Sequence, residues 1–242
     1  MGDPVVHFEI NGTDVKELAS FYGELLGWHI QEVPGNYALI ETHGGGGVNG
    51  GIGQVEDGTP NLRVYAAVAD PQALLDKAQS LGAETVTPVT EIPDMVTYAT
   101  FRDPQGNVFG VVKSGEGPGV QEGDGAPVDW FEILGPDPEA LRSFYGDLFG
   151  WPSKESQSAG GDWQYFEVEG AGIGGGIGSS PDGQSHLNIY ASVDDVQKYF
   201  ERAETSGGKG IMPPQKMGEN LTFALFADPQ GIPFGLYSYS PA

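Results

Sequence analysis

Residues 7–28 read HFEINGTDVKELASFYGELLGW, and the pattern returns at residues 130–151 as WFEILGPDPEALRSFYGDLFGW. The offset between the two stretches is a constant 123 residues, and more than half of the aligned positions are identical. A gap-free match of this length indicates a tandem duplication, which is the first feature to seek in any sequence. The chain of 242 residues is also long enough for two domains of ordinary size.

Hydrophobic periodicity predicts two βαβββ modules in each half. In the first module a strand at residues 5–10 precedes a helix, with Asp14 as N-cap, Glu17 completing a capping box and Gly27 ending the helix. Short strands follow at 28–33, 37–42 and 48–54. The second module has strands at 63–68, 85–88, 95–102 and 108–113, with a helix that begins at Asp70-Pro71.

The second half repeats this order. Residues 114–127 are rich in glycine, acidic residues and proline and predict a flexible linker. We therefore expect an α+β protein with domains at 1–113 and 128–242.

Composition excludes several classes of function. The net charge of −23 would repel a phosphate backbone, so no nucleic-acid partner is expected. No apolar run is long enough for a membrane helix, and the first residues do not resemble a secretory signal. Cysteine is absent, which removes disulfides and thiolate ligands. These observations favour a cytoplasmic protein without a membrane partner.

Paired βαβββ modules with Phe-Tyr…Leu-Gly-Trp after the first strand (Phe-Tyr…Phe-Gly-Trp in the second half), and Asp-Pro-Gln-Gly before the last strand, resemble the vicinal oxygen chelate superfamily. That group includes glyoxalase I, extradiol dioxygenases, and fosfomycin- and bleomycin-resistance proteins. In detail the chain is similar to the two-domain actinobacterial members. The resemblance implies a cupped mixed sheet in each domain, with the helices outside and a small-molecule site inside.

The resemblance also implies four metal-ligand positions in each cup, on the first and last strands of its two modules. In the first half these positions fall on His7, Arg63, Gly110 and a glycine near Gly50–Gly51. In the second half they fall on Trp130, Asn188, Gly235 and a glycine near Gly175. His7 is the only ligand that survives, and a divalent metal generally needs several converging ligands. We expect no cofactor, although a divalent metal is not excluded.

Other side chains on the same strand faces are candidates for contacting a small-molecule ligand. Alternation along the strands places Glu9 with His7, and Tyr65 with Arg63; in the second half it places Glu132 with Trp130, and Tyr190 with Asn188. A pair between Glu9 and Arg63 would be either structural or catalytic. Further aromatic residues are expected mainly in the core, namely Tyr37, Tyr98, Trp163 and Phe223.

Two functions fit these residues. The first is a metal-independent protein of the bleomycin-resistance type that binds a small organic molecule, such as an aromatic or cationic antibiotic-type compound. The second is a glyoxalase-type lyase or isomerase, with a degenerate metal site at His7 and Glu9 or with Glu9 as base and Arg63 stabilising an oxyanion. An extradiol dioxygenase is not expected, because two histidines and a carboxylate cannot be assembled.

The sequence leaves the pairing of modules open. The first module could share a cup with the second or with the fourth, and the grouping of Glu9 with Arg63 assumes the former. Homo-oligomerisation is also left open, because the duplication already supplies the pairing that single-domain relatives obtain by dimerising.

Overall fold

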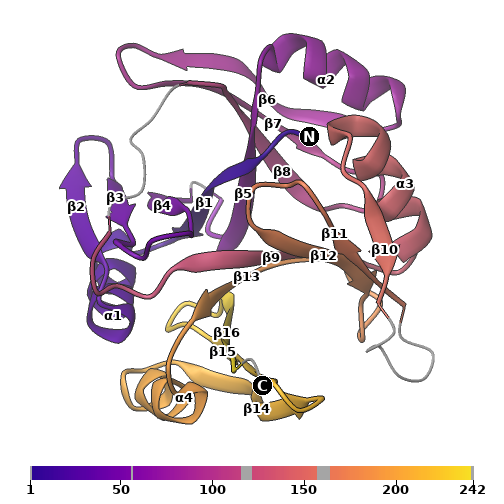
Figure 1. Ribbon diagram of the computed structural model, residues 1–242. Coiled ribbons are helices and arrows are strands. Elements are labelled where there is room, and N and C mark those ends of the chain that lie inside the picture. Colours follow the sequence, from indigo (N-terminus) through magenta and orange to yellow (C-terminus); the bar gives the residue numbers. More distant parts are fainter. Residues whose placement is uncertain (1, 56, 116–121, 157–163, 241–242) are drawn as a thin grey trace. The chain divides into compact units, whose positions relative to one another are not determined.

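The structure is a computed structural model that describes residues 2–55, 57–115, 122–156 and 164–240. The first half consists of β1 (Val5–Gly12), α1 (Val15–Leu26), β2 (His29–Val33), β3 (Tyr37–Glu41), β4 (Asn49–Gln54), β5 (Asn61–Val68), α2 (Pro71–Ser80), β6 (Glu84–Ile92), β7 (Val96–Arg102) and β8 (Val108–Lys113). Figure 1 shows this half in indigo to magenta. The order βαβββ therefore occurs twice, as the sequence predicts.

The second half repeats the same order. It consists of β9 (Val128–Gly135), α3 (Pro138–Phe149), β10 (Ser153–Glu155), β11 (Tyr165–Val168), β12 (Gly174–Ser179), β13 (His186–Ser192), α4 (Val196–Thr205), β14 (Lys209–Met217), β15 (Leu221–Ala227) and β16 (Pro233–Tyr239). Within the ranges that the structure describes, no helix is long and apolar enough to cross a bilayer.

The strands form two eight-stranded mixed sheets, with the orders β2-β3-β4-β1-β5-β8-β7-β6 and β10-β11-β12-β9-β13-β16-β15-β14. Pairing is parallel between β1 and β4 and between β5 and β8, and antiparallel along the hairpins. The predicted α+β class, with mixed sheets made from βαβββ modules, is confirmed.

The packing of the modules does not follow the order of the halves. Contacts divide the chain into two compact units, one made of residues 1–6, 63–119 and 131–187 and the other of residues 7–62, 120–130 and 188–242. We call the first the central unit, because it joins the second and third modules, and the other the terminal unit, because it joins the first and fourth. The predicted domain boundaries at 113 and 128 stay predictions.

In the terminal unit, α1 packs against the last module through an aromatic core. Phe21 contacts Phe226, and both Tyr22 and Trp28 contact Phe234. The buried hydroxyl of Tyr22 donates a hydrogen bond of 3.0 Å to Asp228, the aspartate of the second Asp-Pro-Gln-Gly turn. Burial raises the pKa of the Tyr22 hydroxyl well above its usual range, and the Asp228 charge adds to this effect.

The central unit has the equivalent core. Tyr145 on α3 donates a hydrogen bond of 3.0 Å to Asp103 of the first Asp-Pro-Gln-Gly turn, and Phe109 packs against Tyr145 and Trp151. In the same unit α2 packs on β6 and β7, as Figure 1 shows. The Phe-Tyr motif and the Asp-Pro-Gln-Gly turn therefore contact each other through one hydrogen bond. We call this bond, Tyr22 to Asp228 in the terminal unit and Tyr145 to Asp103 in the central unit, the tyrosine–turn lock.

Two local expectations need correction. Asp14 caps α1 by accepting from the backbone of Lys16 and Glu17, as predicted, but the side chain of Glu17 does not complete the capping box. It accepts a hydrogen bond from Gln230, whose amide oxygen also accepts from the backbone N–H of Asp14. Gln230 of the second Asp-Pro-Gln-Gly turn thus accepts the hydrogen bond that Glu17 would accept in a capping box. The strand predicted at 85–88 is longer, because β6 extends from Glu84 to Ile92 along β7.

The linker is only partly described, because residues 116–121 lie outside the described ranges. Its end is held in the terminal unit. The indole of Trp28 donates to the carbonyl of Ala126, and the backbone N–H of Ala126 donates to the carbonyl of Leu26. This end of the linker is thus hydrogen-bonded to the end of α1 and to Trp28, and the flexibility of the linker stays a prediction.

Candidate functional site

Four tyrosines lie directly over glycines of neighbouring strands. Tyr65 covers Gly110 and Tyr190 covers Gly235, each across a parallel strand pair. Tyr37 covers Gly51, and Tyr165 covers Gly176. A Cβ atom at any of these glycines would collide with the tyrosine ring or its hydroxyl. The glycines are therefore required by close approach of a ring to the backbone, which is a common reason for glycine inside a strand.

The terminal unit contains a hydrogen-bonded row of His7, Tyr37 and Glu9. The Tyr37 hydroxyl donates to Glu9 Oε1 at 3.2 Å, and His7 Nε2 lies 3.4 Å from the same hydroxyl. Burial lowers the pKa of His7 from 6.5, and the charge of Glu9 only partly opposes this, so His7 is neutral at pH 7.

The central unit contains the counterpart of this row. The hydroxyl of Tyr165 donates to Glu132 Oε1 at 3.1 Å, while its ring covers Gly176. Glu132 is the repeat partner of Glu9, so both halves hold this glutamate with a tyrosine hydroxyl. The recurrence favours a shared role for the two carboxylates.

The remaining predicted residues are divided between the units. Arg63 and Tyr65 belong to the central unit, whereas His7 and Glu9 belong to the terminal unit, so the convergence of these four residues stays a prediction. Arg63 is half-buried and its Nε atom is buried without a hydrogen-bond partner among the described residues. Tyr65 is buried.

In the second half, Trp130, Asn188 and Tyr190 all belong to the terminal unit, whereas Glu132 belongs to the central unit. Asn188 and Tyr190 are buried, and Trp130 is half-buried. The structure thus brings three of these four residues into one compact unit.

The residues at the family's ligand positions do not fit a metal ion. A carboxylate at Gly110 or Gly235 would meet the ring of Tyr65 or Tyr190, so the last-strand ligands of the family could not be restored without moving a buried side chain. Of the glycines nearest these positions on β4 and β12, Gly51 and Gly176 lie under tyrosines, whereas Gly50 and Gly175 face phenylalanines. Among the described residues, no group of three histidines, aspartates or glutamates is placed to hold a metal ion.

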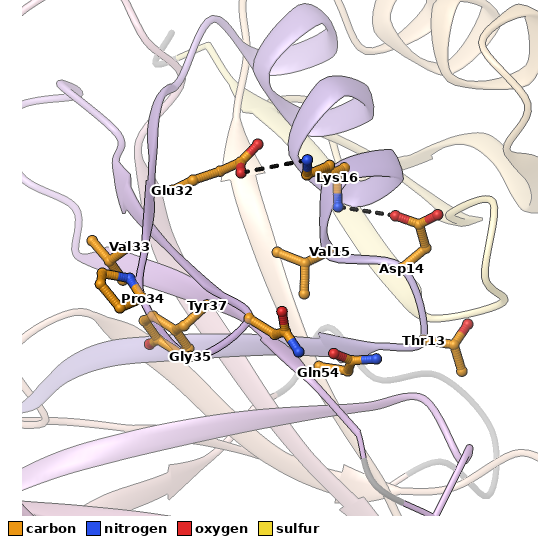
Figure 2. A pocket seen from close by; sticks show the side chains of 11 residues that line it. Thr13, Asp14, Val15, Lys16, Glu32, Val33, Pro34, Gly35, Tyr37 and Gln54 are labelled. Carbon is orange, nitrogen blue, oxygen red and sulfur yellow. Dashed lines mark hydrogen bonds and ion pairs between the residues drawn. The ribbon is translucent and has the colours of Figure 1, made fainter.

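A shallow groove of about 400 Å³ lies beside Tyr37, at one end of the first module (Figure 2). It is lined by the start of α1 and by the hairpin between β2 and β3. Figure 2 shows Lys16 in the groove wall, 3.9 Å from the carboxylate of Glu32. The groove is polar and open, and of the residues in the hydrogen-bonded row only Tyr37 lines it.

Sequence reasoning missed the roles of Tyr37 and Tyr165. Tyr37 was expected in the core, but it is half-buried and bonded to Glu9. A weak signal exists, since both tyrosines begin a short strand ahead of a glycine-rich strand. Their offset is 128 rather than 123 residues, because the intervening loop is longer in the second half, and this hides the equivalence. Trp163 lies outside the described residues.

The fold and the repeated strand sites define a tandem glyoxalase-like protein. A family model described as "Glyoxalase-like domain" matches residues 7–112, and one described as "Glyoxalase/Bleomycin resistance protein/Dioxygenase superfamily" matches residues 128–236. The chain belongs to this superfamily, the vicinal oxygen chelate superfamily.

Among individual proteins, the chain is 26% identical to "Putative glyoxylase CFP32" of Mycobacterium bovis, over 96% of this chain and 94% of that protein. It is 30% identical to "Anthracycline biosynthesis protein DnrV" of Streptomyces peucetius, over 47% of this chain and 46% of that protein.

Two solved structures are similar in fold. The Mn(II)-bound glyoxalase of Novosphingobium aromaticivorans has a TM-score of 0.73 at 17% identity, with 98% of this chain and 83% of that chain covered. The 2,3-dioxygenase LapB of Pseudomonas sp. KL28 has a TM-score of 0.72 at 15% identity, with 100% and 95% covered. At this identity the likeness concerns the fold.

Proposed function

We propose that the chain binds a small organic molecule on the tyrosine-bearing faces of its sheets, without a metal ion. The observation that carries this proposal is the placement of a tyrosine ring over a glycine in every module. Aromatic surfaces with a few fixed polar groups are typical of small-molecule sites. The carboxylates of Glu9 and Glu132, held by tyrosine hydroxyls, would orient the bound molecule.

The tyrosines also explain how the fold can work without metal chemistry. In a metal enzyme the ion fixes the position of an oxygen-bearing substrate. In this chain rigid phenols and carboxylates would do so, because hydrogen bonds to charged groups are stronger than those between neutral groups. Bleomycin-resistance proteins in the superfamily provide a precedent for binding as the whole function, since one fold hosts many functions.

One observation favours a second candidate, a metal-free lyase or isomerase. The row of His7, Tyr37 and Glu9 links three groups that can donate or accept protons within one unit. Glu9 would take a proton from a carbon beside a carbonyl, while the hydrogen bond from Tyr37 would hold its carboxylate in place. Arg63 would stabilise the resulting oxyanion only if the predicted convergence with Glu9 is correct.

The proposal is tested by metal content. Tag-free full-length protein would be dialysed against Mn²⁺, Ni²⁺, Zn²⁺ or Fe²⁺, freed of excess and analysed by plasma mass spectrometry. We expect well below one ion per chain, and we expect 1-naphthylmethanol to bind with the same affinity with and without a chelator. His7→Ala serves as the matched variant, since His7 is the one metal-binding side chain at the family's ligand positions.

The outcomes separate the candidates. One tightly held ion per chain, lost in His7→Ala, would overturn the metal-free proposal. Turnover of a carbonyl substrate that survives chelation and disappears in Glu9→Gln would favour the lyase. Binding of 1-naphthylmethanol to the native protein, with no turnover of any carbonyl substrate, would favour the binding protein.

A further inference from the structure

Asp129 and Tyr237 form a polar pair in the terminal unit that the proposed site does not include. The Tyr237 hydroxyl donates a hydrogen bond of 2.9 Å to Asp129 Oδ1, and both side chains are half-buried. Ser192 is the register partner of Tyr237 on the neighbouring strand. The backbone of Ser192 also donates to the carbonyl of Pro127, which fixes the start of β9 beside β13.

Tyr237 lies on the same face as Tyr190, one of the predicted ligand contacts of this unit. Side chains alternate along β16, so Tyr237 shares its face with Gly235, over which Tyr190 lies. Phe223 on β15 is the antiparallel register partner of Tyr237 and is half-buried. Directly opposed residues of an antiparallel pair point to the same side. Aromatic rings and a carboxylate are thus adjacent on one surface.

The duplication supplies an internal comparison. By the repeat offsets, Asp129 corresponds to Val6, Tyr237 to Val112 and Ser192 to Ala67. The fold therefore accepts apolar side chains at all three positions in its first half. The polar set in the second half is not needed to build the fold, and its presence calls for another reason.

The electrostatic environment of Asp129 also indicates that its carboxylate serves a purpose other than folding. No lysine or arginine in the described ranges forms an ion pair with Asp129. Burial raises the pKa of Asp129, and the hydrogen bond from Tyr237 offsets this only in part. A partly desolvated carboxylate without a cation costs stability, and such costs are commonly retained where they serve a site.

We propose that Asp129, Tyr237 and Phe223 recognise the protonated amino group of a small aromatic amine. The carboxylate would pair with the ammonium group, the Tyr237 hydroxyl would hold the carboxylate in place, and the rings would contact the aromatic part of the ligand. This inference rests on the proposed function, since it names the ligand class for the second half of the chain.

The test uses full-length protein and two probes of the same shape, 1-naphthylmethylamine and 1-naphthylmethanol, titrated by calorimetry. We expect the amine to bind more tightly than the alcohol. Asp129→Asn should weaken binding of the amine by roughly tenfold or more, the usual size of a lost charge-assisted hydrogen bond, and binding of the alcohol by much less. Asp129→Glu, which keeps the charge, should retain part of the preference for the amine.

The matched control is Glu219→Gln, which removes an exposed negative charge from the same unit. It should leave both affinities within about a factor of two, because distant exposed charges are screened. Equal binding of amine and alcohol to the native protein would overturn the inference even if Asp129→Asn failed to fold. Alcohol binding that is unaffected by a chelator would still support the proposed function in that case.

Discussion

At the scale of single residues, tyrosine rings fill the space above the glycines at the family's ligand positions. Gly110 and Gly235 lie under buried tyrosine rings, so the space that a ligand side chain would need is already filled. A metal-ligating side chain at either position would therefore require a buried ring to move. A single substitution back to glutamate would meet the ring before it reached an ion.

We expect Gly110→Ala to destabilise the protein by about 1–3 kcal/mol, because the new methyl group must displace the ring of Tyr65 in a packed core. The cost should disappear in a Tyr65→Ala background, where the space is empty. Gly146→Ala on α3 is the matched control, since its methyl group would meet no atom closer than 3.5 Å. That change should stabilise the helix by roughly 0.5–1 kcal/mol. Urea unfolding of Gly110→Ala, Tyr65→Ala, the double variant and Gly146→Ala measures these free energies. If Gly110→Ala costs the same with Tyr65 present as with Tyr65→Ala, the ring contact is refuted.

A second residue-scale prediction concerns Asp129 and pH. Burial raises its pKa above 3.8 in the folded protein, so the folded state loses stability as pH rises from 3.8 through the folded pKa. Asp129→Asn keeps an acceptor for the Tyr237 hydroxyl and removes the charge. The variant should therefore be more stable than the native protein at pH 7, by up to about 1 kcal/mol.

At pH 3.5 this difference should vanish, because Asp129 is then mostly protonated in both states. Urea unfolding at the two pH values provides the measurement. A variant that is less stable than the native protein at pH 7 would show that Asp129 has a structural role instead.

At the scale of elements, each Asp-Pro-Gln-Gly turn caps a helix from the other half of the chain. The Gln230 side chain accepts from the backbone of Thr13 and donates to Glu17 at the start of α1. Gln105 makes a smaller version of this contact, accepting from the Asp137 backbone N–H and donating to its carbonyl. The helix start therefore depends on a segment more than 200 residues away in the first case and 32 in the second.

We expect Gln230→Ala to cost about 1–2 kcal/mol, comparable to the loss of a helix cap, because it leaves the donors at the start of α1 unpaired. Gln105→Ala should cost less, since Gln105 contacts only Asp137 in α3's cap. Gln31→Ala on an exposed strand position is the control and should be nearly neutral. Thermal unfolding ranks the loss of stability in the three variants. A loss in Gln230→Ala as small as that in Gln31→Ala would contradict the capping role of Gln230.

The elements themselves were largely predictable from the sequence. Caps, glycine helix ends and alternating strands are local signals, and Asp14, Gly27 and Asp70 act as predicted. The second half of the capping box was not predictable, because Gln230 takes the place that local rules assign to Glu17. The hydrogen bond from Tyr37 to Glu9 was also not predictable by local rules, because the two residues lie on different strands and are 28 positions apart.

At the scale of the whole molecule, duplication gave a chain whose halves have diverged on one face while keeping their cores. The tyrosine–turn lock recurs as Tyr22 with Asp228 and Tyr145 with Asp103, whereas the polar pair of Asp129 has no equivalent in the first half. Core positions repeat because packing constrains both copies alike. The faces that bear the candidate site are free to specialise, so sequence alone predicts the fold better than the site.

The tyrosine–turn lock has a further consequence for how such a chain could arise. Each lock joins a helix from one half to a turn from the other, so a half-length chain would carry a tyrosine and a turn that could be satisfied only by a second copy. Its assembly would then depend on protein concentration. Covalent fusion replaces that dependence with a high effective concentration set by the linker. The fused chain can keep its locks closed at any dilution, and its two halves no longer need to remain identical to recognise each other.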